Sequence, residues 1–74
     1  MWIRTSDKSM LLNADSFQII RSGDLWGIVT KENYAPLATY SSYKNALAMM
    51  DIIEDSVANF PDGVVYLRKD DELD

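Results

Sequence analysis

The sequence predicts one small α+β domain, in which a mainly antiparallel sheet of four to five strands carries one helix on one face, in the order ββββαβ. Three observations support this prediction. Two runs of β-branched and aromatic residues flank a glycine-containing turn, apolar residues then recur at helical spacing, and 74 residues suffice for one domain but not two. We expect the domain to span residues 1–69 and residues 70–74 to form an acidic tail.

The first half of the chain is expected to supply the strands. Residues 2–5 and 10–12 are short β-prone runs that could also be loops, whereas residues 17–21 and 25–30 are strongly β-prone. Gly23 lies between the two long runs and can adopt the positive φ that a tight hairpin turn requires. Residues 34–40 follow as a further strand, in which Pro36 indicates an edge position because proline has no N–H to donate.

The second half is expected to supply the helix and a last strand. Ser41 or Ser42 can cap the helix N-terminus, and the helix should end near Asn59 because Pro61 disfavours helical geometry at the residue before it. Residues 64–67 then form a strand. One apolar stripe on the helix should pack on the sheet: Tyr43, Ala46, Leu47, Met50, Ile53 and Val57. Trp2 and Trp26 are expected in the core.

Composition excludes several kinds of chemistry. The chain has no cysteine and no histidine, so it has no disulfide, no Cys/His zinc site, no thiol nucleophile and no imidazole base. Asp51 and Asp55 lie four residues apart on one helix face and could form a catalytic or metal-binding pair, but a solvated helix face is the ordinary interpretation. We therefore expect no enzyme activity and no cofactor. No apolar run could span a bilayer, and we expect a cytoplasmic protein without membrane contact.

Charge is distributed unevenly along the chain. The net charge is −5; residues 1–50 carry five bases and four acids, whereas residues 51–74 carry two bases and eight acids. Such an acidic half disfavours direct nucleic-acid binding, which needs a basic patch, and favours a protein partner with a basic surface.

The helix acids run against the helix dipole, because Lys44 lies in the first turn and the acids lie further towards the C-terminus. Arg68 or Lys69 on the next strand could neutralise them. Alternatively, Ile52, which falls opposite the apolar stripe, could anchor a partner within an acidic rim. The candidate partner-binding residues are Ile52, Asp51, Glu54, Asp55 and Asp62.

Two stretches carry a resemblance. Met1-Trp2-Ile3-Arg4-Thr5-Ser6-Asp7-Lys8 is followed by Leu11-Leu12-Asn13, and residues 37–47 run through a Tyr-Ser-Ser turn into an Ala-Leu helix that continues to Ile53. Together they resemble short uncharacterised proteins of Gram-positive bacteria and their phages. The resemblance implies a phage or mobile-element setting, and it implies no activity and no catalytic residues.

The function that these observations favour is a non-enzymatic protein-interaction module. One version is an inhibitor whose acidic face imitates nucleic-acid phosphates on a basic host protein. The alternative is a structural or assembly protein that associates with itself, because a core this small often relies on a partner chain when it has no disulfide or metal. A homodimer through Ile52 or an edge strand is the corresponding expectation.

Overall fold

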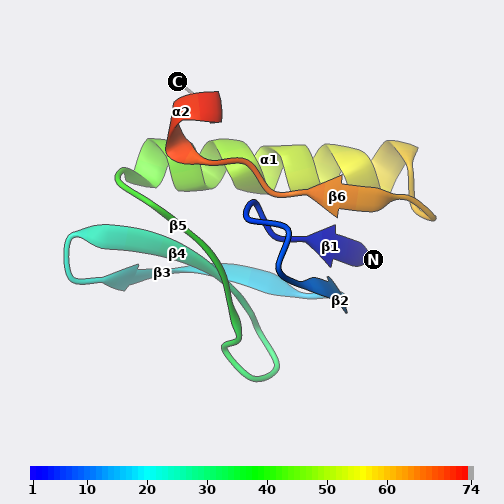
Figure 1. Ribbon diagram of the computed structural model, residues 1–74, viewed down its shortest axis with the longest axis horizontal. Coiled ribbons are helices and arrows are strands. Elements are labelled where there is room, and N and C mark those ends of the chain that lie inside the picture. Colours follow the sequence, from blue (N-terminus) through cyan, green and yellow to red (C-terminus); the bar gives the residue numbers. More distant parts are fainter. Residues whose placement is uncertain (74) are drawn as a thin grey trace.

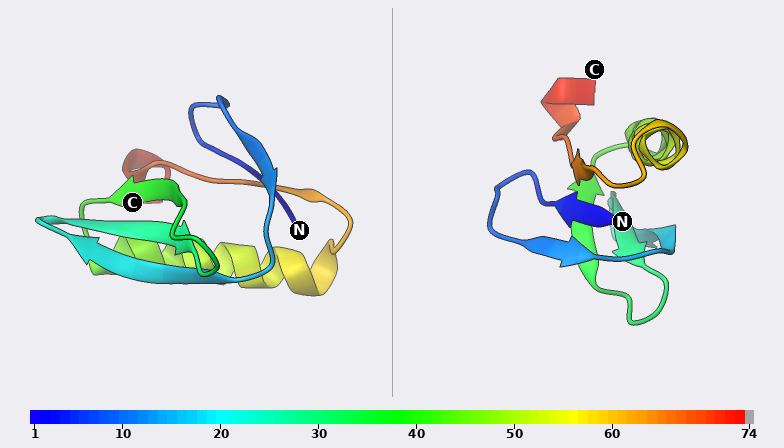
Figure 2. Two further views of the ribbon diagram at one scale, coloured as in Figure 1. Left: turned by 90° about the horizontal axis from the view of Figure 1, so that it is seen from below. Right: turned by 90° about the vertical axis from the view of Figure 1, so that its right-hand side faces the viewer.

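The computed structural model describes residues 1–73 as six strands and two helices (Figure 1). The strands form two three-stranded sheets, and the main helix, α1, lies across them (Figure 2). The first sheet has the order β2-β1-β6 and the second the order β3-β4-β5. The strand bounds are Trp2–Arg4 (β1), Leu11–Asn13 (β2), Phe17–Ser22 (β3), Leu25–Thr30 (β4), Pro36–Tyr40 (β5) and Val64–Tyr66 (β6).

The α+β class is confirmed, but the single sheet of four to five strands is wrong. The chain changes sheet between β2 and β3: the Ala14 N–H donates to the Met1 carbonyl in the first sheet, and the Ser16 carbonyl accepts from the Lys31 N–H in the second. β1 completes the first sheet by pairing parallel to β6, with Ile3 opposite Val65. This pairing joins segments at opposite ends of the sequence, which no local pattern indicates.

The second sheet contains the hairpin that the sequence predicts. β3 and β4 pair antiparallel from Phe17↔Thr30 to Ser22↔Leu25 around a two-residue turn, in which Gly23 has a φ of +61°. β5 pairs with β4 on the other side, with an irregularity in register between Ile28 and Val29. β5 is therefore an edge strand, as Pro36 indicated.

Helix α1 spans Tyr43–Asn59 and begins and ends where expected. The Ser42 hydroxyl accepts from the Asn45 N–H at 3.1 Å, and the Phe60 N–H closes the last turn by donating to the Ser56 carbonyl at 2.7 Å. The predicted packing face was only partly right. The buried α1 residues are Asn45, Ala46, Met49 and Ile53, whereas Tyr43, Leu47 and Val57 are 47%, 41% and 50% exposed.

One hydrophobic core joins both sheets to α1. Ile3 and Val65 come from the first sheet, Ile28 and Tyr40 from the second, and Met49 from the helix. Trp26 packs against this core, but Trp2 is 44% exposed, so the core position expected for Trp2 is wrong.

The expected acidic tail is a folded part of the structure over residues 70–73. These residues form a short helix, α2 (Asp70–Leu73), and Leu73 packs against the core. Asp74, the last residue of that expected tail, lies outside the described residues.

Candidate binding surfaces

The three helix acids of the sequence hypothesis lie on the outer side of α1. Asp51, Glu54 and Asp55 are all exposed and occupy neighbouring positions, three and four residues apart, on the helix surface. We call these three residues the acidic face. The Asp55 carboxylate accepts a hydrogen bond from the Asn59 side chain at 2.9 Å, which keeps its charge directed to the helix surface. The structure thus brings these three predicted residues together.

Internal neutralisation of the acidic face does not occur in the described structure. Among residues 1–73, the salt bridge present joins the N-terminal amine to Asp15 at 3.3 Å, and neither Arg68 nor Lys69 pairs with a helix acid. The charge of the acidic face is therefore left to solvent or to a partner. No group of three or more acids within residues 1–73 is arranged to hold a metal ion.

The other two predicted partner-binding residues do not lie on the acidic face. Ile52 is half-buried and packs against the core, so its predicted position opposite the packing face is wrong. The true buried arc of α1 is centred nearer Asn45 and Met49, which brings Ile52 to its edge. Asp62 is exposed in the turn that follows α1.

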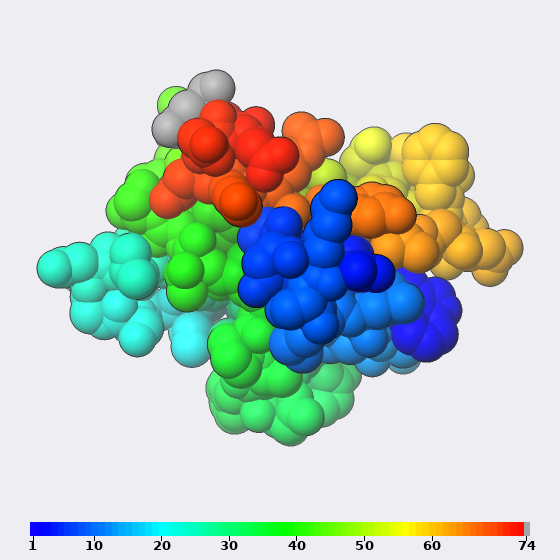
Figure 3. All heavy atoms as spheres, in the orientation of Figure 1, coloured from blue at the N-terminus to red at the C-terminus, as the bar shows by residue number. Residues whose placement is uncertain are grey.

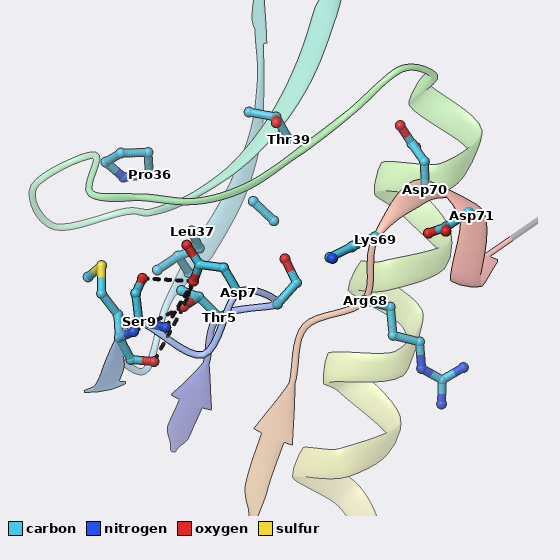
Figure 4. A pocket seen from close by; sticks show the side chains of 13 residues that line it. Thr5, Asp7, Ser9, Pro36, Leu37, Thr39, Arg68, Lys69, Asp70 and Asp71 are labelled. Carbon is cyan, nitrogen blue, oxygen red and sulfur yellow. Dashed lines mark hydrogen bonds between the residues drawn. The ribbon is translucent and has the colours of Figure 1, made fainter.

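A second surface is a cleft of about 630 Å³ between the β1–β2 loop, β5 and the segment that leads into α2 (Figure 4). These three segments meet on the face shown in Figure 3. Lys69 extends into the cleft, whereas Arg68 points away from it (Figure 4). Asp7 is held by three hydrogen bonds, from the Thr5 hydroxyl at 2.8 Å and from the N–H and hydroxyl of Ser9 at 2.9 and 2.7 Å.

Asp70 closes one end of this cleft. Its carboxylate accepts from the Ser41 N–H at 2.9 Å and from the Asn45 side-chain amide at 3.0 Å. The amide of Asn45 is the main cause that lowers the pKa of Asp70 below its ordinary value; burial opposes it, and the Ser41 hydrogen bonds add to it. Asp70 thereby fastens the end of β5 and the start of α1 to the C-terminal segment. This group is structural, and we assign it no ligand.

A third surface, which the sequence hypothesis missed, lies beside the acidic face. It is formed by Tyr43 and Leu47, which are both partly exposed on α1. The Tyr43 ring packs edge-on against Trp26 with 4.8 Å between centroids, which places this side of α1 next to the hairpin. Arg21 of β3 lies over the same Trp26 ring at 5.5 Å. The signal was present in the sequence as the apolar stripe, but it was interpreted as core.

Comparisons of the chain with models of known protein families, with curated proteins and with solved structures give no match. Among the described residues, neither helix has the length and apolar character needed to cross a bilayer.

Proposed function

We propose that the chain is a non-enzymatic protein-interaction module that binds a partner with a basic surface through the acidic face of α1. The observation that carries the proposal is the exposure of Asp51, Glu54 and Asp55 without a basic partner in residues 1–73. Three like charges on adjacent helix positions destabilise a helix slightly, so an external cation would relieve their repulsion.

Exposed apolar side chains beside the acids support the same proposal. Leu47 lies one turn before Asp51, and Val57 lies three residues after Glu54; both are at least two-fifths exposed. An interface commonly combines apolar contacts with a polar rim, and this combination differs from an ordinary solvated helix face. The lack of cysteine and histidine in the chain favours binding over catalysis.

The proposed setting follows from the resemblance to proteins of Gram-positive bacteria and their phages. In this setting the module acts in the cytoplasm, linked to a phage or mobile element, and it inhibits a basic host protein by presenting carboxylates where that protein binds phosphates. Carboxylates on a helix surface would meet lysine and arginine side chains, and long-range attraction would speed the encounter.

The test compares two doubly substituted variants with the same net charge. Asp51→Asn/Asp55→Asn removes charge from the acidic face, whereas Asp24→Asn/Glu32→Gln removes two acids from the exposed hairpin turns. Tagged wild type and both variants are used to capture proteins from cells that carry the gene. A basic protein recovered by wild type and the turn variant, lost with the acidic-face variant and released by salt supports the proposal. Equal recovery by all three chains would contradict it.

A further inference from the structure

Within residues 1–73, the outer edge of β3 has no strand paired with it. In the β3-β4-β5 sheet, β3 pairs with β4 on one side only, over six residues. The opposite edge strand, β5, is protected: it contains Pro36, it has the register irregularity, and Asp70 occupies the Ser41 N–H. β3 has none of these protections. Its free edge is also the longer of the two, six residues against five.

The direction of the β3 backbone groups follows from the pairing with β4. A two-residue turn closes on a hydrogen-bonded pair, here Ser22↔Leu25, and the Ser16 carbonyl accepts from the Lys31 N–H at the other end of the hairpin. Even-numbered residues therefore bond to β4. Phe17, Ile19 and Arg21 direct their N–H and C=O groups to the open side.

The side chains of these three residues lie on the face that α1 covers. Ile19 is opposite the buried Ile28, and Arg21 is opposite Trp26, whose ring touches Tyr43 of α1. Phe17 and Ile19 are only half-buried. The side of α1 with Tyr43 and Leu47 remains uncovered next to them, so a further strand beside β3 would be covered by apolar residues already in place.

We propose that a second copy of the chain supplies this strand by antiparallel pairing of β3 with β3 about a two-fold axis at Ile19. The pattern is self-complementary, because Ile19 pairs with itself, and Phe17 of each copy pairs with Arg21 of the other. All three are residues whose backbone groups point outward. The product is a continuous six-stranded sheet with an isologous interface.

Charge also fits this antiparallel pairing. β3 and α1 run in opposite directions (Figure 1), with Arg21 near the start of the helix through Trp26 and Tyr43. In the antiparallel pairing, Arg21 of the second copy lies opposite Phe17 of the first. This end of β3 lies further along α1, in the direction of Glu54. Arginine of one copy and an acid of the other thus approach across the interface, which favours this arrangement over a parallel one.

The first experiment measures the oligomeric state by sedimentation at micromolar concentrations. Wild type should be a dimer. Arg21→Glu should raise the dimer dissociation constant at least about tenfold, because it places an acid beside Phe17 and Glu54 of the other copy. Lys8→Glu makes the same charge change in the exposed β1–β2 loop and should leave the constant unchanged. Circular dichroism establishes that both variants are folded. A wild-type monomer at about 100 μM, or equal weakening by both variants, would overturn the proposal.

The second experiment tests the register with single cysteines, since the chain has none of its own. Ile19→Cys places two thiols opposite each other at the axis, and mild oxidation should give a disulfide-linked dimer. Ile20→Cys lies one residue away on the opposite face of the strand, with a Cα–Cα separation beyond the roughly 7 Å that a disulfide spans. Equal cross-linking of the two variants would overturn the register. The cysteine cross-links do not depend on the acidic face, so the register of the β3 pairing can be confirmed or overturned separately from the proposed function.

Discussion

At the scale of single residues, the Asp70 side chain joins the C-terminal segment to the start of α1 by hydrogen bonds. Its carboxylate accepts from Ser41 and Asn45, residues that precede and begin α1. The carboxylate accepts the hydrogen bond of the Ser41 N–H, which the carbonyl of a further strand would otherwise accept. One side chain therefore ends β5, fixes the start of the helix and retains the chain after β6.

Asp70→Ala is expected to lower the free energy of unfolding by about 1–2 kcal/mol, because the buried side-chain amide of Asn45 loses this acceptor, whereas water can replace the carboxylate at the exposed Ser41 N–H. Asp71→Ala is the matched control, since Asp71 is exposed and its side chain makes no hydrogen bond or salt bridge within residues 1–73. Urea denaturation of the three chains measures the difference. An equal stability of both variants would show that Asp70 is dispensable.

The pH dependence of stability should follow the hydrogen-bonded acids. The Ser9 N–H, then the hydroxyls of Ser9 and Thr5, lower the pKa of Asp7 to about 2 from 3.8, and the pKa of Asp70 is lowered as well. Because the folded pKa values lie below the unfolded ones, the stabilisation is complete above about pH 4 and is lost as the pH falls towards 2. Melting temperatures from pH 5 to 2 measure it, and Asp7→Asn should flatten the curve. A wild-type melting temperature that is constant to pH 2 would contradict this assignment.

At the scale of the elements, the decisive feature is which side of α1 faces the core. Met49 is fully buried, and its sulfur accepts a weak hydrogen bond from the Arg68 N–H at 3.3 Å, whereas Leu47, two residues earlier, is 41% exposed. Truncation of the two side chains should therefore have very different effects, although both are large and apolar.

Met49→Ala should lower the free energy of unfolding by about 2–5 kcal/mol, the usual range for a buried methionine. Leu47→Ala should lower it by less than about 1 kcal/mol in the monomer, since much of its surface is already in water. Thermal melts at submicromolar concentration keep the comparison to the monomer. A larger loss for Leu47 than for Met49 would mean that the packing face is the one first expected from the sequence.

The sequence was sufficient for the helix ends and the hairpin because their causes are local. Ser42, Pro61 and Gly23 act on backbone within a few residues of themselves. The packing face of α1 was misplaced because Asn45 is polar and so falls outside any apolar stripe, whereas in the structure its amide is buried against Asp70, twenty-five residues later. A partner at that distance in sequence cannot be inferred from periodicity.

The candidate binding residues also include some whose exposure could be predicted from the sequence and one whose position could not. Exposure of Asp51, Glu54 and Asp55 could be predicted, because charged residues at helix positions remain outside unless they are paired. The position of Ile52 could not, since it depended on the same misplaced face.

The split into two sheets also required knowledge of β6, whose pairing with β1 is long-range.

At the scale of the whole molecule, two sheets share one core. Residues of both sheets and of α1 contact one another in a single cluster, so neither sheet has apolar packing independent of the other. The domain should therefore unfold as one cooperative unit.

The two tryptophans allow this to be measured, because Trp2 lies in β1 of the first sheet and Trp26 in β4 of the second. Trp2→Phe and Trp26→Phe each leave one fluorescent reporter. After correction for the stability change of each substitution by circular dichroism, the fluorescence and dichroism transitions of each variant should coincide. A fluorescence transition that precedes the dichroism transition in either variant would indicate that one sheet opens first.

The parallel pairing of β1 with β6 also bears on how the chain reaches its fold. The strand of Ile3 has both of its neighbours only after it pairs with Val65, which lies sixty-two residues later in the sequence. The β3–β4 hairpin needs only adjacent residues and can form early, whereas closure of so long a loop is entropically expensive and slow. During synthesis on a ribosome, the first sheet would stay incomplete until the last strand emerges, with Ile3 exposed in the meantime. Folding of the first sheet in the nascent chain should thus follow the emergence of β6, after the β3–β4 hairpin has had time to form.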